Sequence, residues 1–237
     1  MTQHYLRGRS DQEVSWFQRR DFLQAAAAWA AWGGAATVQA QSRSNVVQLV
    51  GDAMVIGSRL LPQQPIQTGD QITTGPQSML IFVVGNSAFH VRQNSILTVE
   101  RGATLSAVSL LRLLSGAVVS VWGRGAQRQI TTPTLTAGIR GTGVYTEVFE
   151  QQGGRSYFCN CYGTVDMAAG GDRTVSQSEY HQAYWGEASP KNGRMLTPAQ
   201  AINHTDEELE FLARLADQRT AWQISGKKGT KNAAAYL

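Results

Sequence analysis

The sequence predicts an all-β protein made of short strands joined by tight turns. Three observations favour this class: glycine is abundant at 24 of 237 residues, only 16% of the residues are charged, and turn signals recur about every eight to twelve residues. Glycine allows the positive φ angles of tight reversals, and sparse charge disfavours long solvent-facing helices. Such spacing is typical of a sandwich, a barrel or a solenoid-like stack.

Apolar and β-branched runs supply the candidate strands of one domain over residues 41–170. We expect strands at 46–50, 79–84, 88–91, 96–99, 110–114, 117–122, 144–149, 155–162 and 164–167.

The pattern becomes polar and aromatic after Gly171. Residues 171–218 are expected to form a strand or strap at 179–185, followed by a short C-terminal helix. Thr205 to Glu208 is a capping box that starts this helix, with Leu209, Leu212 and Leu215 on one face. Thr197 and Pro198 indicate a further short helix at 199–202, and 219–237 is predicted to be a basic disordered tail.

The N-terminal 40 residues have the architecture of an export signal. An arginine pair precedes Phe-Leu and a weakly apolar, alanine-rich stretch, which resembles a twin-arginine (Tat) signal; the residues concerned are Arg19, Arg20, Phe22, Leu23 and Ala40. Cleavage after Ala40 is expected to release a periplasmic protein that met the Tat translocase during export. An uncleaved membrane anchor is the alternative.

Charge argues against a nucleic-acid partner. The signal carries four of the 21 basic and three of the 17 acidic residues, so the net charge of +4 falls to +3 after cleavage. Such a small excess does not indicate a phosphate-binding surface.

Several motifs, in order and spacing, resemble the FecR domain. They are Gly69 to Gly75, Ser78 to Ser87, Leu114 to Val118, Ile130 to Thr134 with Thr132 and Pro133, Ala137 to Val144 with Ile139, Arg140, Gly141 and Thr142, and Cys161 to Val165 with Tyr162 and Gly163. The resemblance implies an all-β periplasmic module, best known as the sensing half of iron-dicitrate regulators that signal to a sigma factor. Because only a signal precedes the domain, a direct anti-sigma role is not expected.

The stretch around Arg140 can also be interpreted without the family. Gly141 and Gly143 lie between two β-patterned runs, which predicts a strand bend or a close backbone approach. Arg140 would then be held in a packed region, either paired with an acid such as Asp166 or bound to an anionic ligand.

Cys159 and Cys161 are the sharpest local feature, because alternate residues of a strand share one face. A disulfide between them would distort the strand. A metal would need further ligands, and His90 and His181 show no ligand spacing to the cysteines. The sequence therefore predicts two reduced, metal-free thiols packed in a β core, without a cofactor.

Motifs of hydrolases, nucleotide-binding proteins and zincins are absent, so we expect no enzyme. The leading function is a binding or sensing module that recognises a protein partner or an envelope ligand in signal transduction. A thiol-based metal or redox protein using Cys159 and Cys161, and a structural envelope module, stay open as alternatives.

Overall fold

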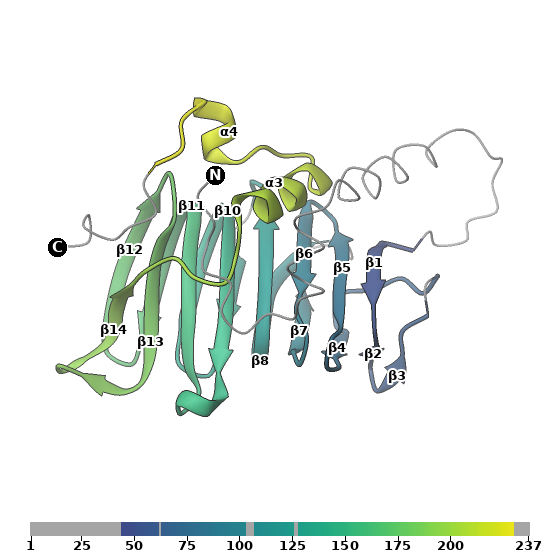
Figure 1. The fold of residues 1–237 in the computed structure, drawn as a ribbon, viewed down its shortest axis with the longest axis horizontal. Coiled ribbons are helices and arrows are strands. Elements are labelled where there is room, and N and C mark those ends of the chain that lie inside the picture. The colour runs from purple at the N-terminus through teal and green to yellow at the C-terminus, as the bar shows by residue number, and fades with distance from the viewer. Residues whose placement is uncertain (1–43, 62, 103–106, 126–127, 230–237) are drawn as a thin grey trace.

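The computed structural model describes residues 44–61, 63–102, 107–125 and 128–229. Within them, fourteen strands hydrogen-bond into one continuous sheet, followed by two helices (Figure 1). The predicted all-β class is confirmed. None of the helices in this part is long and apolar enough to cross a membrane. The predicted signal residues Arg19, Arg20, Phe22, Leu23 and Ala40 lie outside the described residues.

The sheet folds back on itself and forms two layers. Layer 1 contains β1 (Val46–Val50), β5 (Met79–Val84), β6 (Ser87–Val91), the second halves of β8 (Val108–Trp122) and β10 (Thr136–Phe149), the first half of β11 (Arg155–Ala169), β13 (Gln182–Lys191) and β14 (Arg194–Ala199). Layer 2 contains β2 (Ala53–Val55), β3 (Ser58–Arg59), β4 (Gln71–Thr74), β7 (Ile96–Arg101), β9 (Arg128–Thr131), β12 (Asp172–Ser178) and the other halves of β8, β10 and β11.

The three long strands β8, β10 and β11 pass from one layer to the other at glycines. Gly116, Gly141 and Gly163 have φ of +73°, +64° and +100°, a region that residues with a side chain rarely adopt. A Cβ at Gly143 would lie 2.3 Å from Cε1 of Tyr162. The predicted bend and close approach at Gly141 and Gly143 are therefore confirmed.

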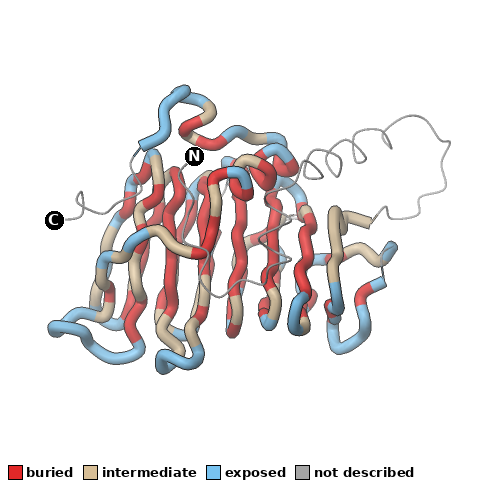
Figure 2. The backbone as a smooth tube through the Cα atoms, in the orientation of Figure 1, coloured by how far each residue is buried: buried red, intermediate tan, exposed pale blue. Residues whose placement is uncertain are grey.

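The central part of layer 1, made of β5, β6 and the adjoining halves of β8, β10 and β11, is buried along most of its length (Figure 2). Its inner face meets layer 2 in an apolar core with Phe82, Phe89 and Trp122 at its centre. Its outer face forms a second core under α3 (Asp206–Leu215) and α4 (Ala221–Ser225). This double burial explains the unbroken apolar run of β5.

The region after Gly171 agrees with the predictions in part. The capping box of Thr205 and Glu208 starts α3, as expected, and the aromatic segment contributes strand β13. The helix predicted at 199–202 is wrong, because Pro198 lies in β14 opposite Tyr184. The described part of the predicted disordered tail instead contains α4, and Lys228 forms an ion pair with Asp206 at 2.9 Å.

Candidate metal centre

Strand β11 presents Cys159 and Cys161 on the outer face of layer 1. Phe158, which precedes Cys159, packs into the inter-layer core on the opposite face, and the side chain of Asn160, which lies between the two cysteines, donates to the carbonyls of Gly163 and Ser176. The two Sγ atoms are 3.7 Å apart. The predicted sharing of one face is confirmed.

His181 reaches the same place from the turn between β12 and β13. Its φ is +47°, and its backbone N–H donates to the carbonyl of Cys161 at 2.9 Å. This hydrogen bond holds the ring over the cysteines, with Nδ1 3.7 Å from Sγ of Cys159.

His204 arrives from the segment between β14 and α3. Its ring stacks on Tyr145, with centroids 4.9 Å apart and 21° between the planes. Nε2 lies 3.4 Å from Sγ of Cys161 and 3.0 Å from Nδ1 of His181.

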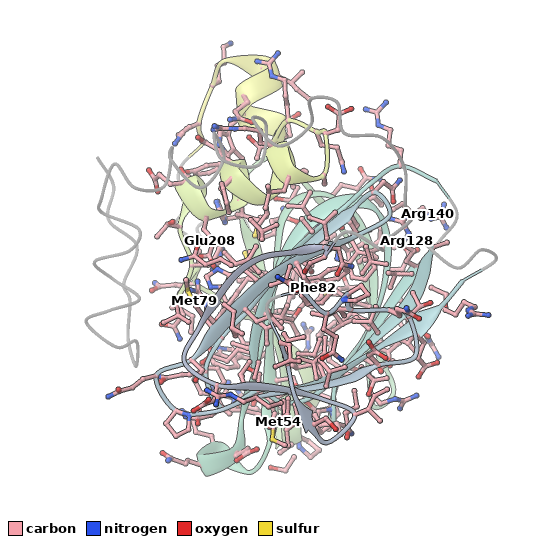
Figure 3. All side chains as sticks on the ribbon, turned by 90° about the vertical axis from the view of Figure 1, so that its right-hand side faces the viewer. Met54, Met79, Phe82, Arg128, Arg140 and Glu208 are labelled. Atoms are coloured by element: carbon pink, nitrogen blue, oxygen red, sulfur yellow. The ribbon has the colours of Figure 1, made fainter. Side chains whose placement is uncertain are left out.

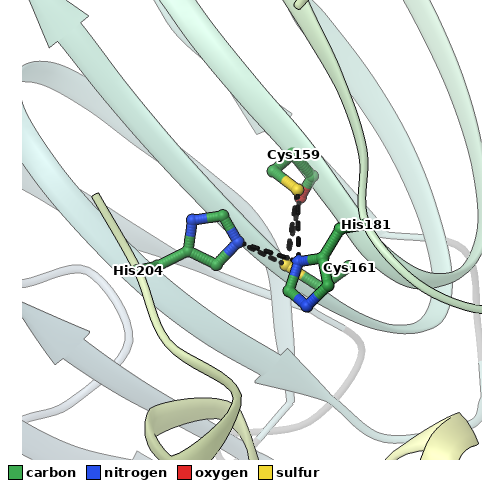
Figure 4. Close-up of side chains that lie close together, drawn as sticks. All are labelled: Cys159, Cys161, His181 and His204. Atoms are coloured by element: carbon green, nitrogen blue, oxygen red, sulfur yellow. Dashed lines mark hydrogen bonds between the residues drawn. The ribbon is translucent and has the colours of Figure 1, made fainter. Parts of the chain in front are cut away.

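These four side chains form a closed Cys2His2 cluster (Figure 4). One ligand atom from each lies within 4.8 Å of all the others, and the residues are at most 2% exposed. With Zn–S of about 2.3 Å and Zn–N of about 2.0 Å, tetrahedral zinc requires S···S, S···N and N···N separations of about 3.8, 3.5 and 3.3 Å. The separations given above come close to this set.

The outward-facing nitrogens of both rings are already engaged. Nδ1 of His204 is 2.6 Å from the carbonyl oxygen of Ile202, and Nε2 of His181 is 3.0 Å from Oδ1 of Asp206. Since both oxygens accept, these nitrogens carry the protons of the neutral rings. The lone pairs on the other two nitrogens then lie 3.0 Å apart, and each also faces a cysteine Sγ, at 3.7 Å for His181 and 3.4 Å for His204. Two unprotonated nitrogens and two sulfurs therefore point into the same small space, where thiol protons or one metal cation can meet them.

Electrostatics in the cluster favour one thiolate and one thiol. Burial would raise the pKa of Cys159, but the hydrogen bond from Cys161 and the imidazoles of His204 and His181 lower it well below its ordinary value. Burial and the adjacent Cys159 raise the pKa of Cys161. Burial lowers the pKa of His181, but Asp206 and Cys159 outweigh this and raise it to about 9. A cation replacing the His181 proton would stabilise both thiolates.

Asp206 supports the cluster from behind. Its Oδ2 accepts from the Tyr180 hydroxyl at 2.9 Å and pairs with Nζ of Lys228 at 2.9 Å. Burial raises the pKa of Asp206, but hydrogen bonds from His181 and Lys228 lower it below its ordinary value. A carboxylate behind a histidine fixes the ring orientation of metal ligands.

The residues of the family resemblance lie mainly elsewhere, in the turn after β9 and around the bends of β10 and β11. Ile139 and Thr142 are buried, Pro133 is exposed, and Oγ1 of Thr132 accepts from the N–H of Leu135 in a turn. From the bend, Tyr162 reaches the second core and packs edge-on against Trp222.

The prediction that Arg140 lies in a packed region is wrong. Its side chain is 61% exposed, and its guanidinium is 3.7 Å from the carboxylate of Asp166. In Figure 3, Arg140 lies on the opposite side of the sheet from Glu208, a residue of α3. Arg140 alternates with the buried Ile139 along β10, so its side chain lies on the opposite, exposed face of the sheet.

Sequence spacing did not indicate the histidines of the cluster. His181 is 22 residues from Cys159, and His204 is 43 residues from Cys161, so no compact motif joins them. Two weaker signals existed: His181 stands among aromatic residues at a strand end, and His204 directly precedes the capping box.

Comparisons with known proteins add a distant likeness in fold. No family model and no curated protein match this chain. Two crystal structures from Parabacteroides distasonis ATCC 8503, each described as a "putative anti-sigma factor", align with TM-scores of 0.46. Identities are 10% and 9%; the alignments cover 56% and 61% of this chain, and 60% and 64% of the solved chains. Similarity at this level does not transfer a function to this chain.

Proposed function

We propose that this chain is an exported β domain that binds one metal ion of the zinc class in the Cys2His2 cluster. One observation carries the proposal: two thiols and two imidazole nitrogens from three separate segments converge within 4.8 Å in a fully buried place. Thiolate and imidazole together favour zinc or a soft ion such as Cu(I) over hard oxygen-binding cations.

The ligand set supports a structural ion. Catalytic zinc sites keep one position open for water or substrate, whereas structural sites use four protein ligands. Here four side chains are available and the residues are at most 2% exposed. The ion would fasten β11, the turn before β13 and the segment before α3 to one another.

Elemental analysis of protein purified under reducing conditions tests the proposal. We expect one zinc or copper per chain, and a cobalt-substituted form with the absorption of tetrahedral thiolate coordination. Cys159→Ser and His204→Asn should lose the ion. His90→Asn is the matched control, because His90 is a buried imidazole that contacts Glu208 and lies outside the cluster. Metal-free wild-type protein, able to bind neither zinc nor Cu(I) when supplied, would refute the proposal.

Export to the periplasm by the Tat route is part of the proposal and rests on Arg19 and Arg20. Replacing both by lysine removes the guanidinium pair that the receptor reads. We expect the doubly substituted protein to stay in the cytoplasm on fractionation, and the wild-type form to have the mass of a chain beginning at Gln41. Normal export of the double variant would contradict this route.

A FecR-type binding role is the second candidate, supported by the sequence motifs and by one surface feature. A groove of about 870 Å³ lies where β12 approaches β13 and β14, and Arg173, Tyr184 and Arg194 are among its lining residues. The groove is open to solvent and mainly polar, and Asp172 also lines it; its two arginines suit an acidic group of a partner or envelope ligand.

Capture from periplasmic extract distinguishes this role from a purely structural one. We expect a partner that is retained by the wild type and lost from an Arg173→Gln, Arg194→Gln double variant. Arg112→Gln is the control, because Arg112 is an exposed arginine on another strand of layer 2. Equal retention by all three proteins would argue against the groove.

A further inference from the structure

The cluster lies beneath an aromatic cover made of Trp222 and Tyr180. The Trp222 ring stacks on His181, with centroids 5.4 Å apart and 26° between the planes. Tyr180 packs edge-on against both His181 and Trp222, at 4.6 Å and 5.3 Å. Trp222 is 3% exposed, so the cover separates the His181 side of the cluster from solvent.

Polar contacts hold the cover in place. Nε1 of Trp222 donates to Glu210 of α3 at 2.7 Å. Lys228, which follows α4, bridges Asp206 at 2.9 Å and Glu210 at 3.5 Å. These bonds join α4 to α3, and Asp206 joins them to His181 through its hydrogen bond.

The opposite side of the cluster offers no comparable route. Cys159 and Cys161 are on a central strand of layer 1, paired with β10 on one side and with β13 on the other. Behind that strand lies the inter-layer core. Uncovering the cysteines from there would require the sheet to unfold.

Helix α4 is, in contrast, a small element. It has five residues and one buried residue, Trp222. Short elements with few buried side chains open at far lower free-energy cost than central strands. Displacing α4 is therefore the smallest movement that uncovers His181.

From this geometry we propose that α4 and its Trp222 close the metal centre, so that the ion enters before α4 packs and then exchanges only when α4 opens. The inference rests on the proposed metal function. The rate of ion release is then set by local opening of α4. The bound ion is one that is available in the compartment where the chain folds.

Release kinetics of the isolated, metal-loaded protein test this inference. The protein is mixed with excess EDTA and samples are desalted and analysed for metal over time. We expect slow release from the wild type and at least about tenfold faster release from Trp222→Ala. Opening α4 in this variant no longer exposes a buried indole to water, so its free-energy cost is lower. Both should start with one ion per chain. Trp222→Phe should release at an intermediate rate and serves if the alanine variant does not fold.

Trp185→Ala is the matched control. Trp185 is also an aromatic residue of the second core, but it packs on Phe149 and Tyr157 instead of His181. Its loss should leave the release rate unchanged. Release from the wild type within the mixing time, or equal rates for both tryptophan variants, would overturn the cover while leaving the metal function standing. Absence of any bound ion would overturn the metal function itself.

Discussion

The two cores on either side of layer 1 differ in chemistry although they share the same strands. The inter-layer core consists of aliphatic and aromatic side chains such as Phe82 and Trp122. The core under the helices adds two thiols to its apolar residues and lies against buried histidines and the ion pair of Arg92 and Glu208. The first requires only burial, whereas the second requires each polar group to find a partner.

This difference explains where function is expected. The inter-layer core is built from apolar side chains packed against one another, so its main contribution is to the stability of the fold. The core under the helices already bears the desolvation of several ionisable groups, which is the setting in which proteins hold metal ions and shift pKa values. Four predictions test this contrast, from the largest expected effect to the smallest.

Phe82→Ala should cost the most, because it leaves a cavity in the core that depends on packing alone. Phe82 is fully buried and stacks on Phe89 at 5.0 Å. We expect a loss of about 3–5 kcal/mol in the free energy of unfolding, measured by urea denaturation, with the metal content unchanged. A loss of bound metal in the folded variant would show that the two cores are not independent.

Glu208→Gln tests the polar core by leaving a buried cation without its counter-charge. Glu208 contacts Arg92 and lies 2.8 Å from Nδ1 of His90, and its side chain is 1% exposed. The expected cost is about 3 kcal/mol. Glu207→Gln, at an exposed position on the same helix, is the control and should be nearly neutral. Similar stability of the two variants would mean that the ion pair contributes nothing.

Gly141→Val tests the bend that connects the layers. The residue has φ of +64°, and a Cβ there would lie 3.2 Å from Cγ of Arg124. We expect about 2–3 kcal/mol of destabilisation from backbone strain and crowding, measured as a shift in denaturation midpoint. Gly154→Val isolates the strain, since Gly154 has φ of +77° and open space around it. A larger loss at Gly154 would exclude crowding as a cause.

Arg140→Ala should have the smallest effect. The side chain is largely exposed and its pair with Asp166 is long at 3.7 Å, so we expect a change within about 0.5 kcal/mol. If thermal denaturation shows a loss of stability close to that of Glu208→Gln, Arg140 takes part in a packed network of side chains.

The sequence was informative where the signal is local. Gly141 and Gly143 predicted the bend of β10, alternating residues placed both cysteines on one face, and the capping box located the start of α3. At Gly116 and Gly163, where separate strands were expected, β8 and β11 instead continue through the glycine as single bent strands. The helix predicted from Pro198 was wrong, because proline is accepted in an edge strand as well as in the first turn of a helix. The two histidines of the cluster could not be predicted, since they meet the cysteines only through pairing of β11 with β13 and packing of the helices, contacts that join residues far apart in the chain.

The bends at Gly116, Gly141 and Gly163 also determine where the chain can be cut. Because three adjacent strands each serve both layers, neither layer is a separable unit. A fragment ending at residue 170 would remove β13, the neighbour of the cysteine-bearing half of β11, and turn that half into an exposed edge open to aggregation. A shortened form intended for expression should therefore keep β13, which covers that edge of β11.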